Sequence, residues 1–238
     1  MARAVLPKLA CLLAGVGVAT FGAAIVSAAS PPSGSMLLRS ALRDAASRGT
    51  VHATEARRSG KATESAVEDL GLNEGTQQVG GSGGWHARIV VVDQTAYISG
   101  NAAGLRTYFG FPAAVAQKVG GRWVSFAASK PGYAAASYGA TLASTLATIT
   151  PTGHLTETAP TKIGGTSVIG IRGTGLALDS GGTPSSITLF VSANANPLPL
   201  LALLGDGKGD TKTVTLSSWG EHLVVKAPHG AVSVFSLG

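Results

Sequence analysis

The chain has 238 residues and a formal net charge of +6 at pH 7, from 18 Lys and Arg against 12 Asp and Glu. Charged residues make up 13% of it, against about 25% in ordinary soluble domains, and hydrophobic residues 45%. The charges are scattered, which argues against nucleic-acid binding, and the single cysteine, Cys11, excludes an intramolecular disulfide. Either the N-terminal segment and Ala-rich helices account for the apolar excess, or part of it serves an apolar ligand.

The first 28 residues have the pattern of an export signal. Arg3 and Lys8 supply a positive start, residues 9–26 form a charge-free apolar run, and the small residues at 26–28 suit a signal peptidase. We therefore expect a secreted or extracytoplasmic protein of the cell envelope, with a mature chain that begins at Ala29.

The apolar run leaves the mode of membrane attachment open. A lipobox needs its cysteine at the end of such a run, whereas Cys11 lies near its beginning, so we expect no lipid there. The run is longer than the roughly 7–15 apolar residues of a cleaved leader, and an uncleaved N-terminal anchor is the alternative. Cleavage would remove two basic residues and no acid, which lowers the net charge to +4.

After the leader we expect a linker over residues 29–35 and one domain over residues 36–238. The linker is rich in Pro, Ser and Gly. In residues 36–47, apolar residues recur at helical spacing with arginines on the other side, which predicts a short amphipathic helix.

Two strands are predicted next, over residues 51–58 and 63–69, with a turn at Lys61 and Ala62. The densest basic cluster of the chain lies here and is balanced by two glutamates, so we interpret it as a solvated hairpin. Its members are Arg57, Arg58, Lys61, Glu55 and Glu64. The glycines that follow predict that a meander of strands continues.

The clearest hairpin joins residues 85–93 to residues 95–99 across a break at Asp93 and Gln94. Its first strand is rich in β-branched residues, which favour extended backbone. Both faces of this strand are apolar, so we expect a helix or a second layer of sheet to cover each of them.

The middle of the chain is predicted to be mainly helical. Residues 101–118 hold two short helical candidates, with Pro112 in the first turn of the second, and residues 122–126 form a strand. The longest helix is expected over residues 130–150 and is ended by Pro151. Its predicted apolar stripe consists of Tyr138, Leu142, Leu146 and Ile149.

The second half of the chain is predicted to be almost entirely β. Turns rich in Gly, Pro, Asn and Asp separate strand candidates at residues 155–158, 167–172, 186–193, 198–203, 211–217, 222–226 and 232–237. These turns are too short for crossover helices, so the sheet is expected to be antiparallel.

Three motifs resemble functional sites without fitting them. Residues 80–84 match G-x-S-x-G, but they lead into a strand, whereas a nucleophile elbow joins a strand to a following helix. His52 and Glu55 lie three apart on a strand and point to opposite faces, so they cannot share a metal. Residues 206–210 resemble a calcium loop, but Lys208 occupies a ligand position. We therefore expect no metal, no cofactor and no catalytic residue.

Several short segments resemble a known family when taken in chain order. They are residues 87–92, residues 95–101, Gly-Arg-Trp-Val at 121–124, the helix ended by Pro151, and residues 197–199 and 214–220. Together they resemble the actinobacterial LppX/LprG group of exported lipoproteins, which is related in fold to the LolA-type lipoprotein carriers. The resemblance covers residues 36–237.

This resemblance implies an α+β fold, in which a strongly curved antiparallel β-sheet, or half-barrel, has helices packed on its concave face. It also implies an apolar cavity for acyl chains. The candidates to line that cavity are aromatic and aliphatic residues of the two helical regions: Leu105, Tyr108, Phe109, Phe111, Tyr138, Leu142 and Leu146. The chain departs from the family in lacking a lipobox, since family members are usually tethered to the outer leaflet.

The leading hypothesis is a non-enzymatic, extracytoplasmic carrier or sensor whose partner is an acyl lipid or glycolipid. We expect it to be a monomer, with peripheral or N-terminal membrane association. The second hypothesis is a structural or interaction domain of the envelope whose cavity is filled by side chains, and an enzyme such as a secreted hydrolase ranks last. An aliphatic and aromatic cavity of roughly several hundred cubic ångströms would favour the first, and a continuous core the second.

Overall fold

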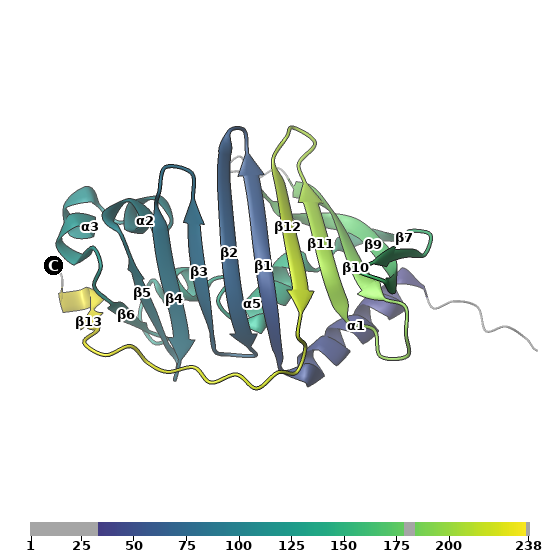
Figure 1. Ribbon diagram of the computed structural model, residues 1–238, viewed down its shortest axis with the longest axis horizontal. Helices are drawn as coiled ribbons and strands as arrows, with labels where there is room; N and C mark the ends of the chain where they lie inside the picture. Colours follow the sequence, from purple (N-terminus) through teal and green to yellow (C-terminus); the bar gives the residue numbers. More distant parts are fainter. Residues whose placement is uncertain (1–32, 179–183, 237–238) are drawn as a thin grey trace, which may run out of the picture. The chain divides into compact units, whose positions relative to one another are not determined.

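The computed structural model describes residues 33–178 and 184–236. The predicted export signal, its cleavage site and Cys11 lie outside the described residues and stay predictions. Within the described part, strands form one sheet in the order β13-β6-β5-β4-β3-β2-β1-β12-β11-β10-β9-β7, and β8 pairs with β9 (Figure 1).

The first half of the sheet is a meander that follows one helix. Each strand pairs antiparallel with the next because short turns connect them. The elements are α1 (Gly34–Arg48), β1 (Thr50–Ser59), β2 (Ala62–Gly71), β3 (Gly75–Gly81), β4 (His86–Val92) and β5 (Thr95–Gly100).

The chain then passes from one side of the sheet to the other through short helices. After α2 (Ala102–Thr107) and α3 (Ala113–Val119), strand β6 (Val124–Ala127) pairs with β5. Helices α4 (Tyr133–Ser137) and α5 (Leu142–Ile149) then lead toward the far edge. Together with α1 they pack on the concave face.

The second half returns from that far edge to the centre. Its strands are β7 (Thr152–Glu157), β8 (Thr161–Ile163), β9 (Thr166–Ala177), β10 (Pro184–Ser192), β11 (Pro199–Gly205) and β12 (Thr211–Ser217). Strand β12 pairs with β1 and so joins the two halves. The predicted fold class is confirmed: an α+β structure with an open, curved, mainly antiparallel sheet.

The β4–β5 hairpin forms as predicted. Asp93 and Gln94 both have positive φ, 49° and 55°, which is the geometry of the two-residue turns that match the twist of a hairpin. Ile89 and Val91 are buried on the concave face, while on the other face Val92 is buried and Val90 half-buried. The expected cover is therefore complete on the concave face and partial on the convex one.

The prediction of one long helix over residues 130–150 is wrong. The segment forms α4 and α5, separated by Gly139 in the left-handed region at φ 75°. Thr141 caps α5 by accepting a hydrogen bond from the Ser144 amide at 3.3 Å, and the Ser144 hydroxyl accepts one from the Gly139 amide at 3.1 Å. Short polar side chains thus offer the backbone a local alternative to continuous helix.

The prediction of a strand over residues 222–226 is wrong, and the prediction of a strand over residues 232–237 holds only for Val232 and Ser233. Residues 222–226 form no strand, because the inner strands already have partners on both edges and β12 lies between β1 and β11. The segment 218–231 instead crosses from the end of β12 to β13 (Val232–Ser233), as Figure 1 shows in yellow. Strand β13 pairs with β6 in parallel, so the sheet is not wholly antiparallel, and the 3-10 helix η1 (Val234–Ser236) follows.

The buried apolar residues fall into two clusters on the concave side rather than one. The first cluster lies under α1 and α5, and its largest members include Leu70, Leu142, Ile149, Ile171, Ile187 and Leu189. The second cluster lies under α2, α3 and α4, and its largest members include Ile89, Val91, Ile98, Leu105 and Phe126. Between them lies the central part of the concave face.

Candidate functional site

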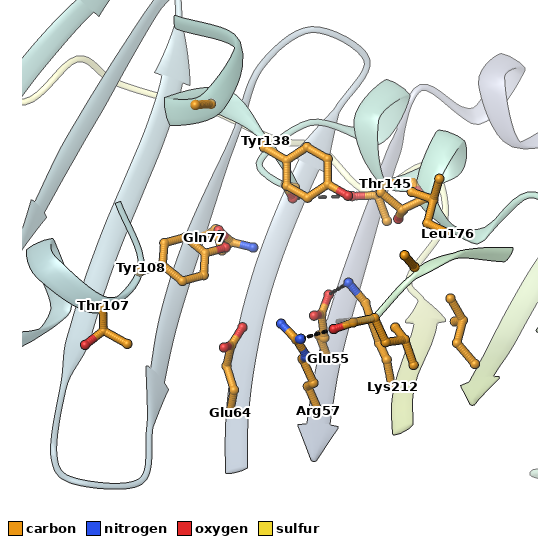
Figure 2. Close-up of a pocket in the computed structure, with 16 residues that line it drawn as sticks. Glu55, Arg57, Glu64, Gln77, Thr107, Tyr108, Tyr138, Thr145, Leu176 and Lys212 are labelled. Atoms are coloured by element: carbon orange, nitrogen blue, oxygen red, sulfur yellow. Dashed lines mark hydrogen bonds and ion pairs between the residues drawn. The ribbon is translucent and has the colours of Figure 1, made fainter. Parts of the chain in front are cut away.

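A cavity of about 320 Å³ lies on the concave face, between the sheet and the helices that cover it (Figure 2). One wall comes from the central strands β1, β2, β3, β11 and β12, and the other from α2, α4, α5 and the end of β9. The lining residues are Glu55, Arg57, Glu64, Gln77, Thr107, Tyr108, Ala135, Tyr138, Gly139, Thr145, Thr148, Leu176, Ala177, Leu178, Leu204 and Lys212.

The sheet wall of the cavity is charged because of strand alternation. On β1, Glu55 and Arg57 follow Val51 and Ala53 at every second position and therefore share their concave face. The register places Arg57 opposite both Glu64 of β2 and Lys212 of β12. Acidic and basic side chains of three adjacent strands thus meet in one row.

The sequence-based interpretation of this region as a solvated hairpin is therefore half wrong. Arg58 and Lys61 are exposed, as expected. Arg57, Glu55 and Glu64 instead line the cavity. The signal was present in the sequence, because these three residues have the same strand parity as buried apolar neighbours.

Glu55 and Lys212 form an ion pair across this wall. Glu55 Oε2 lies 2.6 Å from Lys212 Nζ, and the two side chains are only 14% and 16% exposed. Partial burial weakens screening by water and salt, but each ion also loses hydration. The pair therefore holds the two side chains in place and neutralises both charges, without being a large source of stability.

Arg57 points from the same wall toward the end of β9. Its Nη2 donates a hydrogen bond to the Leu178 carbonyl, while its buried Nε has no partner among the described residues. A guanidinium carries five N–H donors, so most of the capacity of Arg57 is unused.

The side-chain carboxylate of Glu64, opposite Arg57, makes no hydrogen bond or ion pair with another described residue. Burial raises the pKa of its carboxyl above the usual value, and the charge of Glu55 raises it further. Arg57 and Lys212 act in the opposite direction. The cavity thus presents the Glu64 carboxylate, an acceptor, beside the Arg57 guanidinium, a donor, and both have hydrogen-bonding capacity that the described residues do not use.

A buried polar chain lies deeper in the wall. Glu68 is 1% exposed, and its Oε1 accepts a hydrogen bond of 2.6 Å from Gln77 Nε2. Gln77 Oε1 in turn accepts a hydrogen bond of 3.2 Å from the Tyr108 hydroxyl. Burial raises the pKa of Glu68 to about 7, and burial also raises the pKa of Tyr108. Glu68 itself does not line the cavity, but it orients a glutamine that does.

The wall opposite the charged row carries no charged side chain and combines apolar residues with threonines. Tyr138 and Leu176 are 51% and 50% exposed although they line the cavity, so they mark its opening to solvent. Leu178 is buried and lies deeper along this side, while Leu204 of β11 is buried on the sheet wall, where it is the register partner of Lys212. The cavity is therefore amphipathic, with ionic groups on the central strands and uncharged groups facing them, among which Tyr138 and Leu176 are the large apolar ones (Figure 2).

The seven residues predicted to line a cavity are spread over three environments. Tyr108 and Tyr138 line this cavity. Leu105 is fully buried in the second cluster, against which Phe109 and Phe111 pack, while Leu142 is fully buried in the first cluster and Leu146 packs against it. Tyr108, Phe109, Phe111 and Phe126 form a chain of ring contacts with centroid separations of 5.0, 6.5 and 6.5 Å. A role of these residues in lipid contact stays a prediction.

Leu142 gives a direct test of how tightly this part is packed. Because Leu142 is fully buried in the first cluster, Leu142→Trp is expected to overpack it and to destabilise the protein by about 1–3 kcal/mol. Thermal unfolding measures the change. A variant with an unaltered melting temperature would show that free space extends beside Leu142.

The structure bears on the three motifs set aside from the sequence. Ser82 lies in the turn between β3 and β4, with no helix after it, as expected from the rejected G-x-S-x-G match. His52 pairs with Asp69 at 2.7 Å while Glu55 pairs with Lys212, so the two do not converge. Asp206 accepts hydrogen bonds from the amides of Lys208 and Asp210, and the first of these is the main cause of its lowered pKa.

The described residues contain no group of three or more His, Cys, Asp or Glu side chains placed to hold a metal ion. Within the same ranges, no helix has the length and apolar character needed to cross a membrane.

Comparison with known proteins gives similarity of structure rather than of sequence. No family model matches the chain, and no curated protein matches it significantly. LprF from Mycobacterium bovis superposes with a TM-score of 0.50 at 15% identity, over 83% of this chain and 97% of LprF. The lipoprotein LppX of Mycobacterium tuberculosis gives 0.48 at 16% identity, over 83% and 100%. A LolA superfamily protein from Nitrosomonas europaea gives 0.30 at 10% identity, over 81% and 96%. The similarity to LprF shows a shared fold, in agreement with the resemblance drawn from the sequence.

Proposed function

We propose that this protein is an extracytoplasmic, non-enzymatic binding protein or carrier for a lipid or glycolipid of the cell envelope. The observation that carries the proposal is the cavity on the concave face, which separates two apolar clusters at the centre of the sheet. Its volume of about 320 Å³ is at the lower end of the range of roughly 300–1,000 Å³ for ligand pockets.

The composition of the cavity supports an amphipathic ligand. A ligand with an apolar chain can lie against Tyr138 and Leu176, while its polar part faces the row that contains Arg57 and Glu64. The half-exposed Tyr138 and Leu176 provide an apolar entrance from solvent. The predicted export signal places such a ligand outside the cytoplasm.

A second candidate is a structural or interaction domain of the envelope that carries no ligand. The Glu55–Lys212 ion pair and the modest cavity volume favour it, because both reduce the room for acyl chains. The two candidate functions predict different results when the protein is isolated from its own envelope: a carrier retains a bound lipid, and a structural domain does not.

Native mass spectrometry of protein isolated in this way tests the proposal. We expect a population carrying one lipid, and Thr148→Phe should reduce this population about tenfold or more. Thr148 is 7% exposed and lines the cavity from α5, so an aromatic ring at this position projects into the space that the ligand needs.

Ala147→Phe is the matched control, because Ala147 is the preceding residue of the same helix and is exposed. We expect it to retain the bound lipid, and both variants to melt within about 4 °C of the wild type, equivalent to roughly 1–2 kcal/mol. Repeated recovery of lipid-free wild type would contradict a carrier and favour the structural role.

A further inference from the structure

We infer that Arg57 and Glu64 form a subsite for a neutral, hydroxyl-bearing head group, which distinguishes the ligand from a purely apolar lipid. The inference rests on the proposed function, because it names the chemical class of the ligand that the cavity takes. The polar end of the ligand would face the central strands, and its alkyl chain would face the opposite wall of the cavity.

The Arg57 and Glu64 side chains lie side by side at the wall of the cavity. Arg57 and Glu64 are direct partners in the β1–β2 register and both line the cavity. Directly opposed residues of an antiparallel pair have Cβ atoms about 4.5–5.5 Å apart. In spite of this proximity they form no ion pair, since the two described ion pairs involve His52 with Asp69 and Lys212 with Glu55.

Both side chains have hydrogen-bonding groups that no other described residue uses. Arg57 donates from Nη2 to the Leu178 carbonyl, its buried Nε has no hydrogen-bond partner, and the side-chain carboxylate of Glu64 makes no hydrogen bond within the described residues. Polar groups that lose water usually find partners, and each missing partner is costly. A donor and an acceptor left side by side at the wall of a cavity therefore favour a ligand that satisfies both.

The charges around Arg57 and Glu64 favour a neutral head group. The other charges near this pair, Glu55 and Lys212, are already paired with each other, and Glu68 lies buried behind them. An anionic head group at Arg57 would face the carboxylates of Glu64 and Glu55, and a cationic one at Glu64 would face Arg57 and Lys212. A hydroxyl group meets no like charge, because it accepts from a guanidinium and donates to a carboxylate at once.

The apolar side chains at the opening of the cavity orient the alkyl chain of such a ligand. Leu176 and Tyr138 lie across the cavity from the charged row and are half-exposed (Figure 2). An alkyl chain attached to a head group at Arg57 and Glu64 would pass between these two side chains toward solvent. Tyr108 and Gln77, at the side of the cavity, add a hydroxyl and an amide within the polar region.

Four probes with the same alkyl chain, three with different head groups and one with none, test the inference. They are octyl β-glucoside, octane, octyl phosphate and octyltrimethylammonium, each titrated below its micellar concentration or solubility limit into the delipidated full chain. We expect the glucoside to bind at least about tenfold more tightly than each of the others, the size of effect that one or two hydrogen bonds to charged groups produce.

Arg57→Gln should remove this preference and leave the affinity for octane within about twofold. Arg58→Gln is the matched control, because Arg58 is the next residue of β1, lies on the opposite face and is exposed. It should keep the preference. Thermal unfolding of both variants confirms that they are folded, and the ranking of probes by the wild type needs no variant at all.

Every outcome bears on the inference. If octane binds as tightly as the glucoside, the hydroxyl subsite is refuted while the carrier proposal stands. Tightest binding by the phosphate or the ammonium probe also refutes it, as does a preference that survives Arg57→Gln. If no probe binds and isolated protein is lipid-free, both the subsite and the proposed function are refuted.

Discussion

Gly75→Ala is expected to destabilise the protein by at least about 3 kcal/mol, one of the largest effects of a single methyl group in this fold. A Cβ atom on Gly75 would lie 2.5 Å from the Ala140 carbonyl oxygen and 2.9 Å from the Asp69 carbonyl oxygen. Both atoms belong to the backbone, so no side-chain rotation relieves the contact. The connection between α4 and α5 would have to move away from the sheet.

The displaced connection forms part of the cover of the cavity. Gly139 lines the cavity next to Ala140, and a Cβ there would lie 3.1 Å from Gln77 Nε2. We therefore expect Gly75→Ala to weaken ligand binding as well as stability. For a domain of this size, 3 kcal/mol corresponds to a fall in melting temperature of roughly 6–12 °C.

Gly205→Ala in β11 is the control for this substitution. Gly205 also lies in a strand without positive φ, but the nearest atom to a Cβ added there would be 3.9 Å away, in ordinary contact. It should change the melting temperature by less than about 3 °C, since alanine also restricts the unfolded chain. Equal melting temperatures for the two variants would show that the α4–α5 connection yields freely.

The sequence was sufficient to predict the meander, the β4–β5 hairpin and most strands of the second half. These elements depend on local signals, namely alternating or β-branched residues between turns, and the structure forms them close to the predicted residues. The segment 222–226 has the same local pattern and forms no strand, because pairing requires a free neighbour and the central strands have none. Strand formation therefore depends on position in the sheet as well as on local sequence.

The break between α4 and α5 shows how a short polar motif outweighs apolar periodicity. Residues Tyr138 and Leu142 fit a helical stripe, but Gly139 and the cap at Thr141 end one helix and begin another. As a result Tyr138 is half-exposed at the cavity while Leu142 is buried in the first cluster. A glycine followed two residues later by a capping threonine was the signal for this break.

The charged wall of the cavity could not be inferred from charge alone. Acidic and basic residues near a predicted hairpin are usually solvated, and it is the alternation along β1, not the charge, that places Arg57 on the same face as Val51. Glu68 is a further example. It lies on the same face of β2 as Ala66 and Leu70 and is as buried as they are. Neither residue was among the predicted site residues, which were all aromatic or aliphatic.

Glu68 makes the stability of the protein depend on pH in the opposite sense to most carboxylates. Burial is the main cause that raises its pKa from 4.5 to about 7, and the charge of Glu55 adds to it. The hydrogen bond from Gln77 and the charges of Lys212 and His52 lower the pKa, and Tyr108 lies at the far side of Gln77. The folded protein therefore holds a proton on Glu68 at a pH where the unfolded chain has lost it.

The direction of the effect follows from this difference in proton binding. Below about pH 4.5 both states are protonated, and Glu68 adds no pH dependence. Between pH 4.5 and about 7 the folded state binds more protons, so stability falls as the pH rises. Above about pH 7 both states are ionised and the loss is complete. A rise in pKa from 4.5 to about 7 corresponds to roughly 3 kcal/mol.

Glu68→Gln should remove this part of the pH dependence, because glutamine does not ionise and can still accept the hydrogen bond from Gln77. Measured as free energy of unfolding from pH 4.5 to 8, the wild type should lose about 3 kcal/mol more than the variant. Glu157→Gln, which changes an exposed carboxylate on β7, is the control and should follow the wild type. A Glu68→Gln variant whose stability changes with pH as the wild type does would show that Glu68 is already ionised in the folded protein. If the prediction holds, the Glu68–Gln77–Tyr108 chain carries one proton more at mildly acidic pH than at pH 8, and the polar side of the cavity has one negative charge fewer.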